Sequence, residues 1–263
     1  MVSNEDGGRT IKSVDNSLSI LEFLYSMGPN SLSAIAAAVD LSPGSTHTHL
    51  ATLRNHNYVE KSGDEYQLNR RLISLGERAR NQLDIYQAAR KPLHSLAEET
   101  GEAAHLMQEY EGFVLLLYEV YGTNAIGVEY HARKRDRLIR HLHCTASGKA
   151  LLSKLPRDRV ESIIESSGLM KNTPNTITDP ERLFNELEKI DEQGFAISDE
   201  EQMLGMRAVG APVMRVDGTV AGAISVSGPP SRLNGDRLEE TLKNEVLQAV
   251  EVTEINLNSD AHR

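Results

Sequence analysis

The stretch that decides the N-terminal fold is residues 31–53, which read SLSAIAAAVDLSPGSTHTHLATL. Its first half predicts a helix that begins at Ser31 or Ser33 and ends near Asp40, with an apolar face of Leu32, Ile35, Ala36 and Val39. Residues 41–44 form a tight connection, and a second helix follows with Thr46, Leu50 and Leu53 facing inward. Two short helices joined by a turn of this length are typical of a helix-turn-helix.

A further helix and a hairpin flank this segment. Residues 13–25 carry apolar side chains at helical spacing, namely Val14, Leu18, Leu21 and Leu24. Two strand-like runs, 58–62 and 65–68, surround Gly63-Asp64, a strong hairpin turn. Together these elements predict a winged helix-turn-helix domain over residues 10–71. Such domains bind DNA or dock on proteins, and the pattern alone leaves both readings open.

The outward face of the 44–55 helix predicts the residues that contact DNA. Ser45, His47 and Thr48 offer hydroxyls and an imidazole to base edges, whereas His49 points toward the core side and is expected to be structural. This face lacks the arginine that most often reads guanine, so affinity must depend on flanking contacts. We expect the DNA-binding residues to be Ser45, His47, Thr48, Thr52, Arg54 and Lys61. Arg9 and Lys12 are further candidates for phosphate contacts, although such charges are equally typical of a solvated surface.

The charge balance does not exclude nucleic acid. The net charge is -10, yet residues 1–75 hold six basic and eight acidic side chains, so most of the acidic excess lies elsewhere. A length of 263 residues favours two domains. The single cysteine, Cys144, excludes an intramolecular disulfide and a Cys-x-x-Cys zinc pair. No signal peptide or membrane-spanning run is recognisable, so we expect a cytoplasmic protein that does not enter a membrane.

Residues 72–90 predict one amphipathic linker helix. Leu72, Leu75, Ala79, Leu83 and Tyr86 recur at steps of three and four residues among charged side chains. The apolar stripe fits packing on its own domain and packing on a partner chain equally well.

Residues 91–258 predict an α+β domain with an antiparallel sheet. Strand-like runs occur at 103–109, 113–120, 125–131, 209–216 and 219–227, and the last two flank an Asp217-Gly218 hairpin turn. Helical patterns cover residues 146–155, 157–166, 180–193 and 237–256.

Three features of this domain predict a small-molecule site. Thr145 is a good N-cap for the 146–155 helix, whose first amides, at residues such as Ser147 and Gly148, suit an anion. In the last strand, Ala221, Ala223, Ser225 and Ser227 are expected to share one face, opposite Val220, Ile224 and Val226. Residues 194–201 close a helix with glycine and are expected to open a polar loop.

These motifs resemble the IclR family of transcription regulators over residues 11–256. The resemblance rests on residues 31–53, the Tyr58-Val-Glu and Tyr66-Gln-Leu wing, and a C-terminal signature whose matching residues are Gly194, Ser198, Glu201, Ala208, Val209 and Gly210. The chain departs from the signature at Met214 and Arg215. It also carries Thr48 where family members commonly have arginine, so the operator sequence is not transferable.

The resemblance implies a GAF-like effector domain, a linker helix with dimer contacts, and effector contacts at named positions. The expected effector-binding residues are Ala146, Ser147, Gly148, Ser198, Ala208, Ser225 and Ser227. Where some relatives have an acid and a cysteine, this chain has Ser198 and Ala208, so the ligand's identity does not transfer either. Amides and serines favour a small organic or sugar-derived acid. The expected partners are double-stranded operator DNA, the effector, and a second copy in a homodimer or a dimer of dimers.

Enzyme readings find little support in the residues. Gly148-Lys149 resembles a phosphate-binding loop but lacks its first glycine and the hydroxyl after lysine, and no Gly-x-Ser-x-Gly motif occurs. His141, His143 and Cys144 could supply metal ligands, but no fourth ligand is indicated. We therefore expect no catalytic residues, no metal and no cofactor, with zinc at the effector site as a minor alternative.

Overall fold

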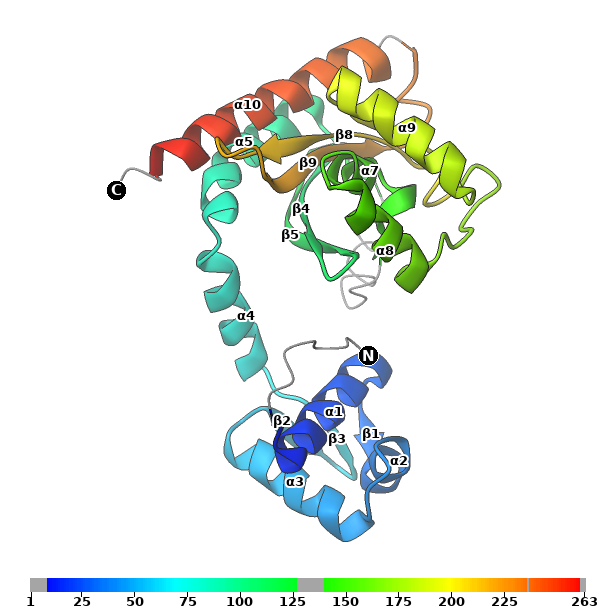
Figure 1. The fold of residues 1–263 in the computed structure, drawn as a ribbon. Coiled ribbons are helices and arrows are strands. Elements are labelled where there is room, and N and C mark those ends of the chain that lie inside the picture. Colours follow the sequence, from blue (N-terminus) through cyan, green and yellow to red (C-terminus); the bar gives the residue numbers. More distant parts are fainter. Residues whose placement is uncertain (1–8, 127–139, 236, 261–263) are drawn as a thin grey trace. The chain divides into compact units, whose positions relative to one another are not determined.

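The computed structural model describes residues 9–126, 140–235 and 237–260, and the chain divides into two compact units, Met1–Ala79 and Arg80–Arg263 (Figure 1). The predicted winged-helix domain and effector domain fall on the first and second unit respectively. Each unit has its own hydrophobic core and is described by itself.

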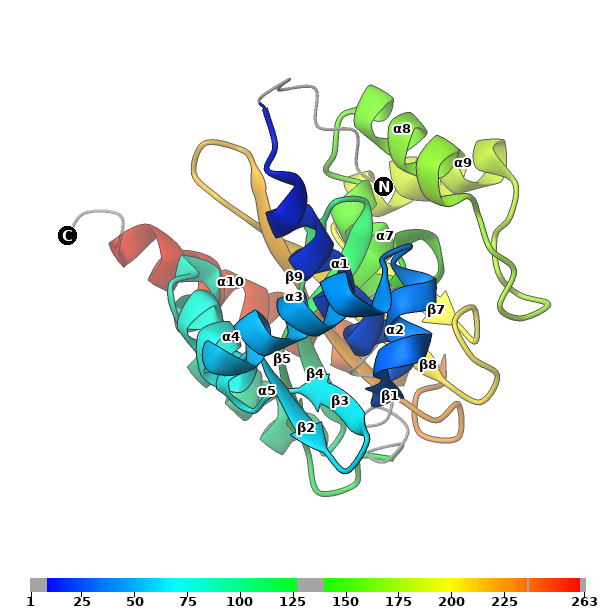
Figure 2. The same cartoon turned by 90° about the horizontal axis from the view of Figure 1, so that it is seen from below.

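The first unit is a three-helix domain with a small sheet. Its elements are α1 (Lys12–Met27), β1 (Asn30–Ser31), α2 (Leu32–Ala38), α3 (Pro43–Asn55), β2 (Val59–Ser62) and β3 (Glu65–Leu68). The β2–β3 hairpin forms the predicted wing and lies beside α3 (Figure 2). Sequence reasoning missed β1, a two-residue strand that pairs with β3.

Capping residues explain where α2 and α3 begin. The Ser31 hydroxyl accepts from the Ala34 amide at 3.3 Å, and the Ser42 hydroxyl accepts from the Ser45 amide at 3.1 Å. Pro43 occupies the first turn of α3, where a missing N–H costs nothing. These short-range contacts explain why the helix-turn-helix prediction is confirmed.

The core of the first unit buries a different stripe of α1 from the one that its spacing suggests. Leu24 is buried and Leu21 packs partly against the core, but Val14 and Leu18 are about half exposed and Ile20 is fully buried. The core residues are Ile20, Leu24, Ile35, Leu50, Leu53, Val59 and Tyr66. The predicted helix is confirmed, and its buried stripe is centred on Ile20 and Leu24 rather than on Val14 and Leu18.

The predicted single linker helix over 72–90 is wrong, since the chain forms two helices, α4 (Arg71–Asn81) and α5 (Asp84–Thr100). Leu83 between them is extended, and the Asp84 carboxylate receives two hydrogen bonds from Arg215, at 2.6 and 2.9 Å. No residue of α4 is buried, whereas much of α5 lies in the core of the second unit. The contact between Asp84 and Arg215 lies at the point where the helix is interrupted, although the amphipathic pattern of the sequence continues across it.

The second unit is built on a six-stranded sheet with the strand order β6-β5-β4-β9-β8-β7. All neighbouring pairs are antiparallel, which confirms the predicted α+β class. The strands are β4 (Ala103–Tyr110), β5 (Phe113–Tyr121), β6 (Arg140–His141), β7 (Ala196–Asp199), β8 (Arg207–Met214) and β9 (Val220–Gly228). The polar loop expected at 194–201 is in fact mainly the edge strand β7, and the strand expected at 125–131 lies largely outside the described residues.

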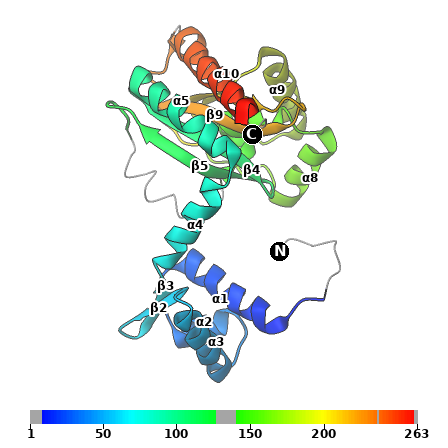
Figure 3. The ribbon, with the colours of Figure 1, turned by 90° about the vertical axis from the view of Figure 1, so that its left-hand side faces the viewer.

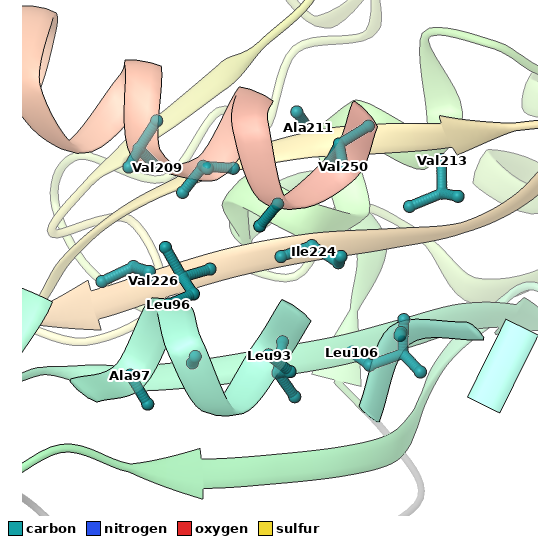
Figure 4. Packing of buried hydrophobic residues seen from close by; sticks show 14 of the residues in the cluster. Leu93, Leu96, Ala97, Leu106, Val209, Ala211, Val213, Ile224, Val226 and Val250 are labelled. Carbon is teal, nitrogen blue, oxygen red and sulfur yellow. The ribbon is translucent and has the colours of Figure 1, made fainter. Parts of the chain in front are cut away.

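Helices cover both faces of this sheet. They are a 3-10 turn (Leu142–Cys144), α7 (Ala146–Leu152), α8 (Arg157–Ser167), α9 (Pro180–Gln193), a π-helical turn (Arg237–Leu242) and α10 (Lys243–Asp260). Helices α5 and α10 lie side by side over one face (Figure 3), where Leu93, Leu96 and Val250 meet Leu106 and Ile224 of the sheet (Figure 4). Burying each leucine contributes about 2 kcal/mol. Helices α7 and α9 pack on the other face.

A bulge in β9 changes which of its residues share a face. Val213 pairs with Gly222 but Met214 pairs with Val220, so Ala221 is the extra residue. Ala221 therefore joins the α5/α10 side with Ile224 and Val226, contrary to the predicted grouping with Ala223. Beyond the bulge, successive side chains of β9 alternate between the two faces of the sheet as expected. Ser225 and Ser227 therefore share the face that α7 covers.

None of the helices in the described part of the chain is both long enough and apolar enough to span a membrane.

Candidate nucleic-acid interface and ligand pocket

The outer face of α3 carries the residues expected to contact DNA. His47, Thr48, Thr52 and Arg54 are exposed, and Ser45 at the start of the helix is half-buried. The opposite face of α3 is fixed to the core by Thr46, Leu50 and Leu53. The helix thus presents one short polar surface from a single continuous segment.

Both threonines on this surface use their hydroxyl hydrogens within the helix. Thr48 Oγ1 donates to the Gly44 carbonyl at 3.0 Å, and Thr52 Oγ1 donates to the Thr48 carbonyl at 3.0 Å. Each oxygen keeps lone pairs that can accept from adenine or cytosine amino groups, and each methyl can contact thymine. The side chain of Thr48 therefore offers a base edge different groups from those of an arginine.

Positive charge flanks the same surface. Arg54 lies in the last turn of α3, and Lys61 lies exposed on β2 with its Nζ 5.6 Å from the centre of the Tyr66 ring.

His49 is hydrogen-bonded through Nδ1 to Ser17 Oγ of α1 at 2.8 Å. That contact agrees with the structural role expected for His49.

A pocket in the second unit opens between the sheet and the start of α7. Its empty space, including the mouth, is about 410 Å³, and only part of that space is wide enough for a water molecule. It is lined by His105, Met107, Thr145, Ala146, Ser147, Ser198, Gln202, Met206, Ala208, Ser225 and Ser227. These residues come from β4, α7, β7, the β7–β8 turn, β8 and β9.

Six of the seven residues expected to contact an effector line this pocket. They are Ala146, Ser147, Ser198, Ala208, Ser225 and Ser227. A glycine makes the convergence possible: a Cβ at Gly210 would lie 3.0 Å from both the Ser147 amide nitrogen and Ser225 Cβ. The start of α7 can therefore pack closely on β8 and β9.

Gly148, the seventh expected residue, does not line the pocket. Its amide donates to Thr145 Oγ1 at 2.9 Å, so this N–H is already used by the helix cap. A Cβ at Gly148 would lie only 2.1 Å from the Leu142 carbonyl oxygen. The glycine serves the packing of the 3-10 turn against α7, and its prediction as part of an anion seat was wrong.

The hydroxyls of the pocket are partly engaged with the protein. Ser198 Oγ donates to the Cys144 carbonyl at 3.0 Å, and Ser147 Oγ donates to Met107 Sδ at 2.9 Å. Ser225 Oγ donates to Ser147 Oγ at 3.4 Å, a long and weak contact. Ser147 and Ser225 can therefore turn toward a ligand at little cost.

Sequence reasoning missed His105, a buried polar side chain in the pocket wall. His105 Nε2 lies 2.8 Å from Ser227 Oγ, and its Nδ1 lies 3.0 Å from Glu119 Oε1. Tyr121 Oη donates to the other carboxylate oxygen of Glu119 at 2.5 Å. The one available signal was a polar residue within the apolar run of β4, on the same face as Met107.

A buried ion pair lies close to the pocket without lining it. Lys149 of α7, 1% exposed, contacts Glu201 Oε1 at 2.6 Å and Glu186 Oε1 at 3.3 Å. Burial raises the pKa of Glu201, against the lowering effect of Lys149. The Glu201 carbonyl also accepts from Thr176 Oγ1 at 2.6 Å. These contacts hold the β7–β8 turn, which carries Gln202 and Met206, against α7.

The possible metal ligands are occupied with other contacts. His143 Nε2 donates to the Met170 carbonyl at 3.0 Å, and the Cys144 thiol donates to the His141 carbonyl at 3.2 Å. Burial raises the pKa of the Cys144 thiol to about 11, which keeps it protonated at neutral pH. Within residues 9–126, 140–235 and 237–260, no group of three potential ligands is placed to hold a metal.

Comparison with known proteins gives the class to which these two sites belong. Residues 13–63 match the IclR helix-turn-helix domain, and residues 77–253 match the domain described as bacterial transcriptional regulator IclR C-terminal. The chain belongs to the IclR family. It is a DNA-binding transcriptional regulator, and it is not an enzyme.

Similar proteins cover nearly the whole chain. A probable HTH-type transcriptional regulator ArcR of Halobacterium salinarum is 34% identical, with 98% of each chain covered. The regulator KdgR of Escherichia coli is 29% identical, with 91% of each covered. The crystal structure of Thermotoga maritima IclR aligns at a TM-score of 0.72 with 26% identity, covering 94% of this chain and 99% of that one.

One structural neighbour was crystallised with a ligand. An IclR homologue from Microbacterium hydrocarbonoxydans, in complex with 4-hydroxybenzoate, aligns at a TM-score of 0.77 with 20% identity over 93% of this chain and 98% of that chain. At this identity the likeness establishes the fold alone.

Proposed function

We propose that the second unit binds a small organic or sugar-derived acid, and that binding changes the affinity of the first unit for operator DNA. The single observation that supports this proposal is that six of the residues expected from the family resemblance line one small pocket that contains several hydroxyls. Hydroxyls of Ser147, Ser225 and Ser227 supply hydrogen bonds suited to a carboxylate. The related protein crystallised with 4-hydroxybenzoate binds an acid of this kind.

On the DNA side, we propose that Ser45, His47 and Thr48 contact bases. Thr52 extends this surface, and Arg54 and Lys61 contact phosphates on either side of it. The exposure of His47, Thr48, Thr52, Arg54 and Lys61 supports these roles. A regulator of promoter DNA is expected to act in the cytoplasm. The proposed activity requires no cofactor.

We further propose that two copies associate through α4, giving a homodimer or a dimer of dimers. Ile73 is 66% exposed and Leu75 is 40% exposed, and α4 has no buried residue. Because exposed apolar side chains gain stability when they are covered, a second copy is the expected partner. In sedimentation velocity, the double variant Ile73→Glu/Leu75→Glu should shift to a smaller species, whereas the exposed-charge control Glu77→Lys should not. An unchanged sedimentation coefficient would rule out α4 as the interface.

The experiment that tests the regulator proposal uses purified full-length protein and the DNA upstream of its own gene and of neighbouring genes. Binding is followed by fluorescence anisotropy across a salt series, without and with lactate, glycerate or 4-hydroxybenzoate. We expect saturable, sequence-selective binding that at least one of these acids alters. Selective binding that none of them alters would reject these small acids as effectors, and nonselective, salt-labile binding alone would reject the operator-reading surface.

A further inference from the structure

Four polar side chains in contact with one another cross three adjacent strands and end in the pocket, with hydrogen bonds at both ends and a close His105–Glu119 contact between them. They run from Tyr121 and Glu119 on β5 through His105 on β4 to Ser227 on β9. The side chains of His105 and Glu119 are 3% and 2% exposed, so solvent does not compete for these contacts. Three strands thus fix the orientation of one imidazole at the pocket wall.

The carboxylate of Glu119 influences which nitrogen of the His105 imidazole carries a hydrogen. An ionised carboxylate only accepts hydrogen bonds, and Tyr121 already donates to Glu119 Oε2. The 3.0 Å approach of Glu119 Oε1 to His105 Nδ1 therefore favours a hydrogen on Nδ1, because a carboxylate beside a bare ring nitrogen would be repelled. A singly protonated imidazole would leave Nε2 as an acceptor for the Ser227 hydroxyl.

A carboxylate ligand reverses the direction of the last hydrogen bond. To bind the ligand, the Ser227 hydroxyl must donate into the pocket, so its oxygen must accept from His105 Nε2. Both ring nitrogens then carry hydrogens, and the imidazole is positively charged. A neutral ligand that donates to Ser227 makes no such demand.

Among the described residues that line the pocket, His105 alone can provide this charge. The eleven residues that line the described pocket include no lysine and no arginine, and His105 is the one that can become cationic. Two charged residues near these strands are already paired: Glu102, just before β4, with Arg232 at 2.6 Å, and Lys149 of α7 with Glu201 at 2.6 Å. A buried anion without a compensating charge would be strongly disfavoured.

We propose that His105, bound as an imidazolium, is the residue that selects a carboxylate effector, and that Glu119, held by Tyr121, is its positioning residue. The proposal rests on the proposed function, in which this pocket binds the effector. Hydroxyl, imidazole and carboxylate in this order also occur in hydrolases, but because the family members are regulators we assign the arrangement to binding.

Isothermal titration calorimetry on the wild-type protein tests the proposal without any substitution. The probes are lactate, glycerate and 4-hydroxybenzoate, each compared with its amide, at pH values from about 5.5 to about 8.5. We expect carboxylate affinity to fall as pH rises, about tenfold per pH unit at the alkaline end. Affinity for the amides should stay flat, and buffers of different ionisation enthalpy should reveal proton uptake only with the acids.

Two variants assign the effect to the proposed residues. His105→Gln keeps a polar side chain but cannot become charged, and should lose about 10- to 100-fold in carboxylate affinity together with its pH dependence, while amide affinity is kept. Glu119→Gln weakens the support of the imidazolium, and should move the pH dependence to lower pH. His143→Gln, an equally buried histidine away from this pocket, is the matched control and should resemble the wild type.

The outcomes separate the two proposals. If the wild type binds a carboxylate with no pH dependence beyond that of the amide, or if folded His105→Gln binds it equally well, the role of His105 is overturned while the acid effector stands. If the wild type binds none of the carboxylates at any pH, the small-acid effector is overturned and the role of His105 with it. Normal thermal unfolding and DNA binding confirm that each variant is folded.

Discussion

The two candidate sites of this regulator are built in opposite ways. The DNA-contact surface on α3 comes from one continuous segment of 13 residues, exposed on one side and fixed on the other by its own small core. The ligand pocket gathers buried side chains from positions as far apart as His105 and Ser227. The first can be altered by changing one exposed residue, whereas the second depends on strand register, a bulge and buried ion pairs.

The largest expected effect breaks the first site alone. Thr48→Glu should reduce selective DNA binding by about 100-fold or more, because a carboxylate on the exposed face of α3 would repel phosphates and would lack the methyl group that can contact thymine. Fluorescence anisotropy measures the loss. Ser26→Glu, which adds the same charge at an exposed position of α1, should retain most of the affinity. Tight selective binding by Thr48→Glu would show that α3 does not read DNA through this face.

A smaller effect concerns the stability on which the second site depends. Lys149→Met should lower the free energy of unfolding of the second unit by about 3 kcal/mol, because Glu201 would remain as a buried charge without its closest partner. Lys154→Met is a suitable control, since its partner Asp191 is 56% exposed and the pair should contribute less than about 1 kcal/mol. Urea unfolding followed by circular dichroism checks both values. Equal losses would mean that burial does not govern these ion pairs.

The positive residues beside α3 should have moderate effects. Arg54→Ala and Lys61→Ala should each weaken DNA binding by about three- to tenfold for all sequences alike, and should reduce the slope of log affinity against log salt by about one. Arg157→Ala, in a surface ion pair of the second unit, should leave both quantities unchanged. An unaltered salt slope in Arg54→Ala would exclude a phosphate contact by this residue.

The smallest expected effect concerns the contact that separates α4 from α5. The guanidinium of Arg215 lowers the pKa of Asp84, so the contribution of this carboxylate to stability is present above its unfolded pKa and lost as pH falls through its lower folded pKa. Because the pair is partly exposed, Asp84→Asn should cost only about 0.5 kcal/mol near neutral pH. The difference from the wild type should disappear at acid pH in parallel unfolding curves. A difference that grows on acidification would contradict the sign of this effect.

The same contrast explains how much the sequence could predict. The helix-turn-helix and wing were predictable because Ser31, Ser42 and the Gly63-Asp64 turn act on their immediate neighbours. The break before Asp84 was not predictable, since it depends on Arg215, which lies 131 positions away. The strand β1 was missed because two residues are too few for a pattern.

In the pocket, sequence and family resemblance predicted the serines and the start of α7, but not the contacts that decide their roles. Gly148 looked like part of an anion seat, although the Thr145 side chain takes its amide. His105 was invisible because its meaning depends on Glu119 and Ser227, which pair with it only across the sheet. The bulge at Ala221 displaced one residue of a strand that otherwise alternated as expected.

The most direct test of the account measures DNA binding and acid binding side by side in three proteins: wild type, Thr48→Glu and Ser227→Ala. Anisotropy with the selected upstream DNA and calorimetry with the tightest of lactate, glycerate and 4-hydroxybenzoate provide the two affinities. We expect that Thr48→Glu binds the acid normally but not the DNA, and that Ser227→Ala binds the DNA with an affinity that the acid no longer alters. The central claim of a DNA-reading helix controlled by an acid-binding pocket would be contradicted if the wild type bound no DNA selectively, or if the acid altered DNA binding by Ser227→Ala as much as by the wild type.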